Sequence, residues 1–246
     1  MKTYVISDVH GLWTRFSDFL DILQEDDSVY VLGDVVDRGP DGIKILRYIM
    51  DHPQQFKMLL GNHEHMMLSY LEETKGVDMS KASLWQIKNI RHLYDWWVLR
   101  NQGLPTLDAY EGLSSEMQEE VLHFIKSLPV AYPSIKVGDN IFYMVHSMPG
   151  SLDKNVVLQT DLTGKKEINR YVWERDDLPT SFYVDDRIVV SGHTMTIFRH
   201  GKLEVYISKD EDGNVRYIDI DCGCAMNTSE SRLACLCLDD LSIQYF

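Results

Sequence analysis

Two stretches decide the fold of this chain: Ser7-Asp8-Val9-His10-Gly11 and Gly33-Asp34-Val35-Val36-Asp37-Arg38-Gly39. Each follows a run of apolar residues and ends at glycine, so carboxylates and an imidazole lie where a strand ends and a loop begins. The same arrangement recurs at Gly61-Asn62-His63-Glu64, at Val145-His146-Ser147 and at Ser191-Gly192-His193-Thr194. Five strand ends that offer Asp, Asn and His side chains predict the ligand shell of a centre with two metal ions.

The first 71 residues alternate between strand and helix patterns. Short apolar runs at 4–6, 29–32 and 56–60 predict strands, and apolar residues at helical spacing follow each of them. Pro40 stands where the first residue of the second helix is expected. This alternation is typical of an α/β fold with a largely parallel sheet, in which ligands gather at the carboxyl ends of the strands.

The pattern changes between about residues 75 and 133, where amphipathic helices are predicted. We interpret this stretch as a helical insert that lies on the sheet, within a single domain of residues 1–246. A capping box at Ser115 and Gln118 is expected to open one of these helices. The insert carries three of the five tryptophans, and we expect them to form its core rather than a platform for substrate: Trp85, Trp96 and Trp97.

Strand patterns dominate from Leu203 to the end, with a hairpin turn predicted at Asp212-Gly213. The four cysteines lie in this part, as the pairs Cys222/Cys224 and Cys235/Cys237. Their spacing is narrower than that of most zinc sites, and their neighbours are apolar. We therefore expect buried, reduced thiols, with a soft-metal or redox site as the alternative.

The composition limits the partners of this chain. It has 246 residues, 44% of them apolar, and a formal net charge of -14. A field of this sign repels phosphate backbones and anionic lipid, which argues against duplex nucleic acid and membrane surfaces. Apolar runs are shorter than the ~20 residues needed to cross a bilayer, and the first strand leaves no room for a removable leader. These features predict a cytoplasmic location.

The donor types indicate which metals fit. Asp8 and His10 flank one residue and can reach the same cation, whereas Asp34 follows the neighbouring strand and can lie between two cations. Mixed oxygen and nitrogen donors without thiolate suit manganese, iron(II) or zinc better than calcium. Each stretch alone has a plainer interpretation: an Asp that caps a helix, a partly buried histidine, or a glycine needed for a turn. Their occurrence together, always at strand ends, favours metal binding.

The whole series resembles the calcineurin-type metallophosphoesterases, in the branch of Ser/Thr protein phosphatases and symmetric diadenosine-tetraphosphate hydrolases. The resemblance covers nearly the whole chain, and Gly33–Gly39 is its most specific part. The tract 97–110 also resembles the insert of small bacterial and phage phosphoprotein phosphatases. The resemblance implies a four-layer α/β/β/α sandwich with a helical insert and two divalent cations, manganese before iron or zinc.

The resemblance also implies a role for each residue. Asp8, His10 and Asp34 would hold the first cation. The second would be held by Asp34 as a bridge and by three further residues: Asn62, His146 and His193. Arg38 and Arg175 would grip the phosphate, although either arginine is also explained as a solvated loop residue.

The expected chemistry follows from charge. Two cations ~3.5–4 Å apart lower the pKa of a shared water, and the resulting hydroxide attacks phosphorus in line. His63 is placed to protonate the leaving oxygen. Asp37 is expected to hydrogen-bond His63 and to favour its imidazolium form.

Three functions remain open at this stage. The favoured one is a phosphatase for phosphoserine or phosphothreonine in proteins, and the alternative is a hydrolase for symmetric dinucleoside polyphosphates. Protein phosphatases carry an arginine where this chain has Leu60, which weakens the first assignment. A non-catalytic phosphate-binding scaffold is the third, and the complete set of expected ligands argues against it. The predicted substrate is thus a phosphoprotein or a small phosphorylated molecule.

Overall fold

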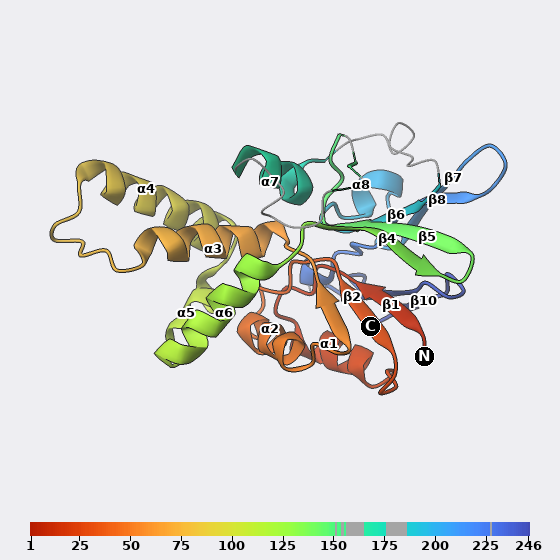
Figure 1. Ribbon diagram of the computed structural model, residues 1–246, viewed down its shortest axis with the longest axis horizontal. Helices are drawn as coiled ribbons and strands as arrows, with labels where there is room; N and C mark the ends of the chain where they lie inside the picture. Colours follow the sequence, from red (N-terminus) through yellow and green to blue (C-terminus); the bar gives the residue numbers. More distant parts are fainter. Residues whose placement is uncertain (151, 154, 156–164, 176–185, 227) are drawn as a thin grey trace.

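The chain folds into two five-stranded mixed sheets, as described by a computed structural model for residues 1–150, 152, 153, 155, 165–175, 186–226 and 228–246 (Figure 1). The first sheet has the order β10-β9-β1-β2-β3. Its strands are β1 (Thr3–Ile6), β2 (Ser28–Val31), β3 (Phe56–Met58), β9 (Ala234–Cys237) and β10 (Ile243–Tyr245). The second has the order β4-β5-β6-β8-β7. Its strands are β4 (Ala131–Val137), β5 (Asn140–Val145), β6 (Ile188–Ser191), β7 (Tyr206–Lys209) and β8 (Val215–Asp219).

Parallel pairing connects the strands that carry the predicted site. β1 pairs with β2 and β2 with β3 in one sheet, and β5 pairs with β6 and β6 with β8 in the other, all in parallel. The remaining pairs are antiparallel, including the β7–β8 hairpin. That hairpin turns at residues 210–214, where Gly213 has φ of +85°, and so the predicted turn is confirmed. The carboxyl ends of these six parallel strands therefore lie at neighbouring edges.

Helices cover the outer faces and form the insert. The helices are α1 (Trp13–Leu20), α2 (Gly42–Asp51), α3 (Asn62–Thr74), α4 (Leu84–Tyr94), α5 (Leu104–Glu111), α6 (Ser115–Ser127), α7 (Lys165–Trp173) and α8 (Ile197–His200). Residues Asp95–Arg100 form a π-helical turn, and Cys224–Met226 form a 3₁₀ turn. None of the helices in the described residues is long and apolar enough to cross a membrane.

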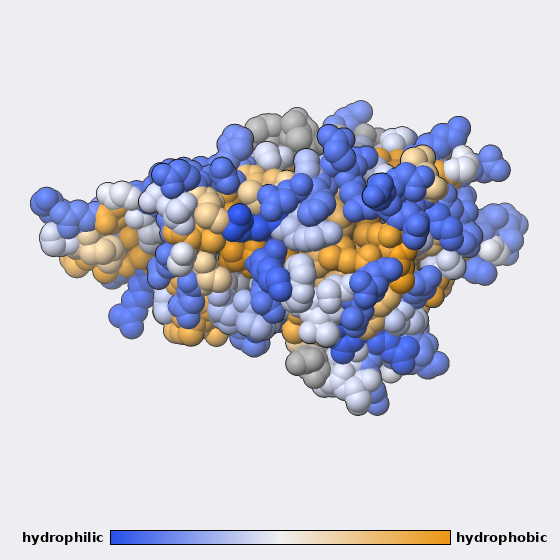
Figure 2. Space-filling view, turned by 90° about the horizontal axis from the view of Figure 1, so that it is seen from below, coloured by the Kyte–Doolittle hydropathy of each residue, from blue (hydrophilic) through white to orange (hydrophobic). Residues whose placement is uncertain are grey.

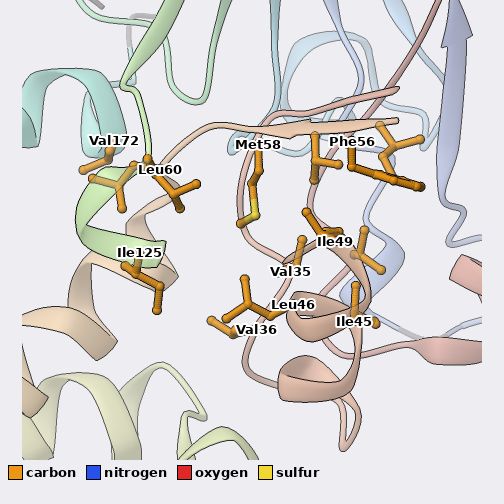
Figure 3. Packing of buried hydrophobic residues seen from close by; sticks show 14 of the residues in the cluster. Val35, Val36, Ile45, Leu46, Ile49, Phe56, Met58, Leu60, Ile125 and Val172 are labelled. Atoms are coloured by element: carbon orange, nitrogen blue, oxygen red, sulfur yellow. The ribbon is translucent and has the colours of Figure 1, made fainter. Parts of the chain in front are cut away.

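The layers follow from the alternation of side chains along each strand. Val5, Tyr30 and Phe142 belong to a buried cluster between the two sheets. Their neighbours Tyr4 and Val29 face the other way, into the cluster beneath α1 and α2. Figure 3 shows this second cluster, with side chains of α2 packed beside those of β3. The predicted four-layer α/β/β/α sandwich is confirmed, with α7 and α8 on the outer side of the second sheet (Figure 1).

The helical insert projects from the sheets. In Figure 1, α3 and α4 extend side by side to the far left, and α5 and α6 return toward the sheet. Trp97, Leu107 and Val121 continue the buried cluster beneath the first sheet. That the insert belongs to a single domain of residues 1–246 stays a prediction.

The end of the insert was predicted too late. β4 begins at Ala131, so the expected boundary at residue 133 falls inside a strand. β4 is an edge strand, and its pairing with β5 shifts register between Tyr132 and Ile135, around Pro133. Proline has no N–H to donate, which is tolerated on the open side of an edge strand. In the sequence, however, a proline argues against a strand, so this one was not predicted.

Two helix starts also differ from the prediction. Ser114, not Ser115, caps α6, because its hydroxyl accepts the N–H of Met117, while the Gln118 amide donates to the carbonyl of Tyr110. α2 begins at Gly42, two residues after Pro40. Both errors are shifts of one or two residues along the correct segment.

The tryptophans of the insert divide between core and surface. Trp97 is fully buried, as expected, but Trp96 is 39% exposed and Trp85 is 70% exposed. The prediction that all three form the core is therefore wrong for two of them. Figure 2 shows apolar residues at the surface of the α3–α4 end of the molecule.

The four cysteines are buried and free, as expected, and burial raises the pKa of each thiol.

Candidate metal centre

The predicted metal ligands converge on one buried site. Asp8 and His10 follow β1, Asp34 follows β2, and Asn62 opens α3 directly after the loop from β3. The two remaining histidines follow β5 and β6 of the second sheet: His146 and His193. All six side chains are buried. The two sheets thus bring together residues up to 185 positions apart, as in the hydrogen bond from the His193 N–H to Asp8 Oδ2 at 3.0 Å.

Asp34 belongs to two groups of potential ligand atoms. One group contains His10, Asp34 and His63, and the other contains Asp34, His146 and His193, with the atoms of each group within 4.8 Å of one another. Asp34 Oδ2 lies 3.7 Å from His10 Nε2, and Asp34 Oδ1 lies 3.4 Å from His146 Nε2. Asp8 Oδ1 lies 3.9 Å from His10 Nε2. The two oxygens of one carboxylate therefore face two separate clusters.

Hydrogen bonds orient the imidazoles for coordination. His10 Nδ1 lies 3.0 Å from the carbonyl oxygen of Val36, and His146 Nδ1 lies 2.7 Å from that of Leu32. These contacts place the ring proton on Nδ1 and leave the Nε2 lone pair facing the cluster, as in many metal-binding histidines. Burial lowers the pKa of both rings, which favours the neutral form that coordinates metals.

The donor set around Asn62 fits a cation. Asn62 Oδ1 lies 3.0 Å from His146 Nε2 and 2.9 Å from His193 Nδ1. The other nitrogen of each ring faces a backbone carbonyl, at Leu32 for His146 and at Trp173 for His193. With the ring protons on those nitrogens, three lone pairs point toward one another. A divalent ion at their centre is the partner that this arrangement lacks.

The buried carboxylates also indicate a cation site. Burial raises the pKa of Asp34 well above its usual range, and the nearby Asp8 and Glu64 raise it further. Burial and Asp8 likewise raise the pKa of Asp221, whose side chain lines the same cavity. Buried acidic groups this close together are stabilised when a bound cation supplies positive charge. The residues therefore fit a pair of divalent ions.

Backbone strain concentrates at this site. In the described part of the chain, eight non-glycine residues have positive φ, and six of them are predicted site residues: Asp8, His10, Asp34, Asp37, Arg38 and His193. Each such residue costs about 1–3 kcal/mol and persists only where its surroundings hold it. Gly192 lets the strands approach closely, because a Cβ there would overlap Ser7 Oγ and Asp8 Oδ2.

Glu64 holds the Asp34 loop in its strained conformation. Its Oε2 accepts the N–H groups of Asp34 and Gly61, and its Oε1 accepts those of Val35 and Val36, at 2.8–3.3 Å. The carboxylate is fully buried. It thereby satisfies four backbone donors that have no strand or helix partner.

We expect Glu64→Gln to lower the free energy of unfolding by about 2–3 kcal/mol, because the amide group would face two backbone donors. Denaturant unfolding followed by circular dichroism measures this loss. Glu120→Gln is the matched control, since Glu120 is exposed on α6; its effect should stay within about 0.5 kcal/mol. Equal stabilities of the two variants would contradict this role of Glu64.

A cavity of about 80 Å³ opens above the candidate ligands. Arg38 and Arg175, the two arginines expected to bind phosphate, both line it. Four further lining residues were not predicted: Asn101, Trp173, Met195 and Asp221. Asp221 follows β8 ahead of Gly223, so it repeats the strand-end pattern of Asp8 and was detectable from the sequence. Asn101 and Trp173 carried no such signal.

His63 and Asp37 form the predicted pair. His63 Nδ1 lies 2.6 Å from Asp37 Oδ2, and His63 Nε2 lies 3.2 Å from an Nη of Arg38. Trp97 Nε1 donates to the same carboxylate oxygen at 2.9 Å. The hydrogen bond is confirmed, but burial and Arg38 lower the pKa of His63 well below its usual value. The hydrogen bond to Asp37 opposes this shift, and that it favours the imidazolium form stays a prediction.

Known proteins share sequence and fold with this chain. The symmetrical bis(5'-nucleosyl)-tetraphosphatase of Wigglesworthia glossinidia brevipalpis is 32% identical over 118 residues, which are 46% of this chain and 43% of the relative. That of Haemophilus ducreyi is 36% identical over 129 residues, which are 47% of each chain. The enzyme of Proteus mirabilis is 27% identical over 176 residues, or 67% of this chain and 62% of the relative. The chain spans about half the length of these curated relatives.

Solved structures with low sequence identity share the fold alone. A Ser/Thr phosphatase from Saccharomyces cerevisiae aligns with a TM-score of 0.59 and 13% identity, over 100% of this chain and 79% of that one. A metallophosphoesterase from Sphaerobacter thermophilus aligns with a TM-score of 0.54 and 16% identity, over 100% and 86%. The family model for calcineurin-like phosphoesterases matches residues 1–196, which is most of the chain. The protein belongs to the calcineurin-like phosphoesterase family.

Proposed function

We propose that this protein is a metal-dependent hydrolase that cleaves symmetric dinucleoside polyphosphates. The observation that carries the proposal is the position of Asp34, whose two oxygens face two separate clusters of buried ligand atoms. Asp8, His10 and Asp34 would hold one divalent ion, and Asp34, Asn62, His146 and His193 the other. Bound there, the ions supply Lewis acidity that activates water and offsets charge on the phosphoryl oxygens.

Other side chains around the cavity would bind the phosphoryl group and donate a proton. Arg38 and Arg175 line the cavity and would orient the phosphoryl group through their guanidinium forks. His63 would donate a proton to the leaving oxygen through Nε2, while Asp37 holds its Nδ1. Asp37 is fixed in turn by Trp97 and by Thr106, whose hydroxyl accepts the Asp37 N–H at 2.8 Å.

Two observations support a dinucleotide over a phosphoprotein, which reverses the order predicted from the sequence. The curated relatives are tetraphosphatases. In addition, Leu60 occupies the position where protein phosphatases have an arginine, and it is fully buried. Figure 3 shows Leu60 among the core side chains, close to Val172 and Ile125. This position therefore contributes no phosphate clamp to the cavity.

The test is hydrolysis by protein reconstituted separately with Mn²⁺, Zn²⁺ or Fe²⁺. We expect diadenosine tetraphosphate and water to give two molecules of ADP, faster than phosphate is released from phosphoserine or phosphothreonine peptides. A chelator should abolish the reaction, and added metal should restore it.

Three results would contradict parts of the proposal. Faster turnover of the phosphopeptides would favour the phosphoprotein phosphatase predicted from the sequence. Unequal nucleotide products would exclude symmetric cleavage. Folded protein that binds two metal ions but hydrolyses none of these substrates would indicate a phosphate-binding scaffold.

A further inference from the structure

An apolar recess lies directly beside the metal centre. It has a volume of about 330 Å³ and is lined by residues of α3, α4, the π-helical turn and α7: His65, Met66, Ser69, Leu93, Trp96, Trp97, Asn169 and Trp173. Trp173 also lines the metal cavity, where its ring packs edge-on against His193 with centroids 6.0 Å apart. The two hollows therefore share one indole as a wall.

The recess presents aromatic surface that the described residues leave partly exposed. The rings of Trp96 and Trp173 lie 5.8 Å apart at 47°, and Trp96 remains 39% exposed. A partly exposed indole beside a catalytic cavity is typical of a ligand pocket, because such pockets combine apolar walls with a few polar groups. Ser69 and Asn169 supply polar groups here.

The π-helical turn gives two adjacent tryptophans different environments beside the recess. Within Asp95–Arg100, Trp97 is buried and donates its N–H to Asp37, while Trp96 is partly exposed, and both line the recess. π-Helical turns are rare and often occur at functional sites. The same turn thus couples the His63–Asp37 pair to the wall of the recess.

We propose that the recess binds one nucleobase of a substrate whose phosphates lie at the metal centre. This inference rests on the proposed hydrolase function and names what its second subsite recognises. A base is a flat ring with polar edges: the ring stacks on Trp96 and Trp173, and the edges face Asn169 and Ser69. Stacking tolerates any base, so the subsite selects nucleotides over phosphoprotein side chains without selecting one base.

The kinetic test compares Trp96→Ala with Trp85→Ala, the matched control at the exposed start of α4. We expect Trp96→Ala to raise KM for diadenosine tetraphosphate about tenfold, because base stacking on an aromatic ring contributes an effect of this order. KM for β-glycerophosphate, which has no ring, should not change. Trp96→Phe should restore most of the loss, whereas Trp96→Leu should not.

Two kinetic outcomes would overturn the inference. The first is an equal KM for the dinucleotide in Trp96→Ala and Trp85→Ala. The second is an equal rise in KM for phenyl phosphate, which would show that the recess accepts any aromatic ring, including phosphotyrosine.

A binding readout separates this inference from the proposed function. Adenosine carries no phosphate, and we expect it to quench tryptophan fluorescence in the wild type and in Trp85→Ala but not in Trp96→Ala. This titration tests base binding in the recess even if the protein hydrolyses no substrate. Equal quenching in Trp96→Ala and the wild type would contradict base binding at this site.

Discussion

Replacing Asp34 with asparagine is expected to lower kcat/KM by at least about a thousandfold. The reason is that Lewis-acid stabilisation by the ions would lower the activation barrier by several kcal/mol. Elemental analysis should show fewer than two metal ions per chain. Both effects follow from the position of the carboxylate between the two ligand clusters. An amide offers only one oxygen ligand and no charge, so it cannot serve two cations.

The substitution is well matched to the backbone. Asn is one of the few residues that adopt positive φ readily, and Asp34 has φ of +56°. Its amide oxygen can still accept the His63 N–H, which lies 3.0 Å from Asp34 Oδ1. We therefore expect the variant to fold, as circular dichroism would show.

Asp41→Asn is the control for this experiment. Asp41 lies in the same loop, immediately before α2, but its side chain makes no capping hydrogen bond and does not line the metal cavity. This variant should keep both ions and its activity. If Asp34→Asn also retained two ions and turned over at the wild-type rate, Asp34 would not bridge the centre.

Replacing His63 with alanine is expected to reduce kcat by about 10²–10⁴-fold, the range for general acid catalysis. The metal content should stay close to that of the wild type. His63 Nε2 is 3.9 Å from Asp34 Oδ2, close enough that a ligand role is a real alternative. Elemental analysis separates the two roles, because loss of a ligand removes metal whereas loss of a proton donor does not.

The leaving group provides a second measurement for His63. Phenolate needs protonation more than p-nitrophenolate does, so His63→Ala should slow phenyl phosphate hydrolysis more than p-nitrophenyl phosphate hydrolysis. His123→Ala, on the exposed face of α6, is the control and should slow neither. An equal loss for both substrates would argue against proton donation by His63.

The candidate ligands were predictable because each depends on a short stretch of chain. An apolar run followed by Asp or His and a glycine identifies a strand end, and parallel strands place such ends together. This reasoning found Asp8, His10 and Asp34, and the same signal at Asp221 was overlooked. The pairing of His63 with Asp37 was also predicted, since both follow closely after strand ends.

The long-range packing of the insert was not predictable in the same way. Helical spacing shows which side chains share a face, but not whether another element covers that face. The π-helical turn at Asp95–Arg100 changes this spacing, so Trp96 and Trp97 point to different environments. The exposure of Trp85 likewise depends on how far α3 and α4 extend beyond the sheets (Figure 1).

The sequence by itself determined the α/β alternation and the set of candidate metal ligands, because strand periodicity and loop chemistry are local properties, and the family resemblance implied the sandwich. Only the tertiary structure decided that Trp97 supports Asp37, that Leu60 is buried, and that Trp96 and Trp173 form a recess beside the metal centre. The Trp97–Asp37 and Trp96–Trp173 contacts join residues 60 or more positions apart in the chain. Their formation depends on which surfaces meet when helices pack, and local sequence does not encode that choice.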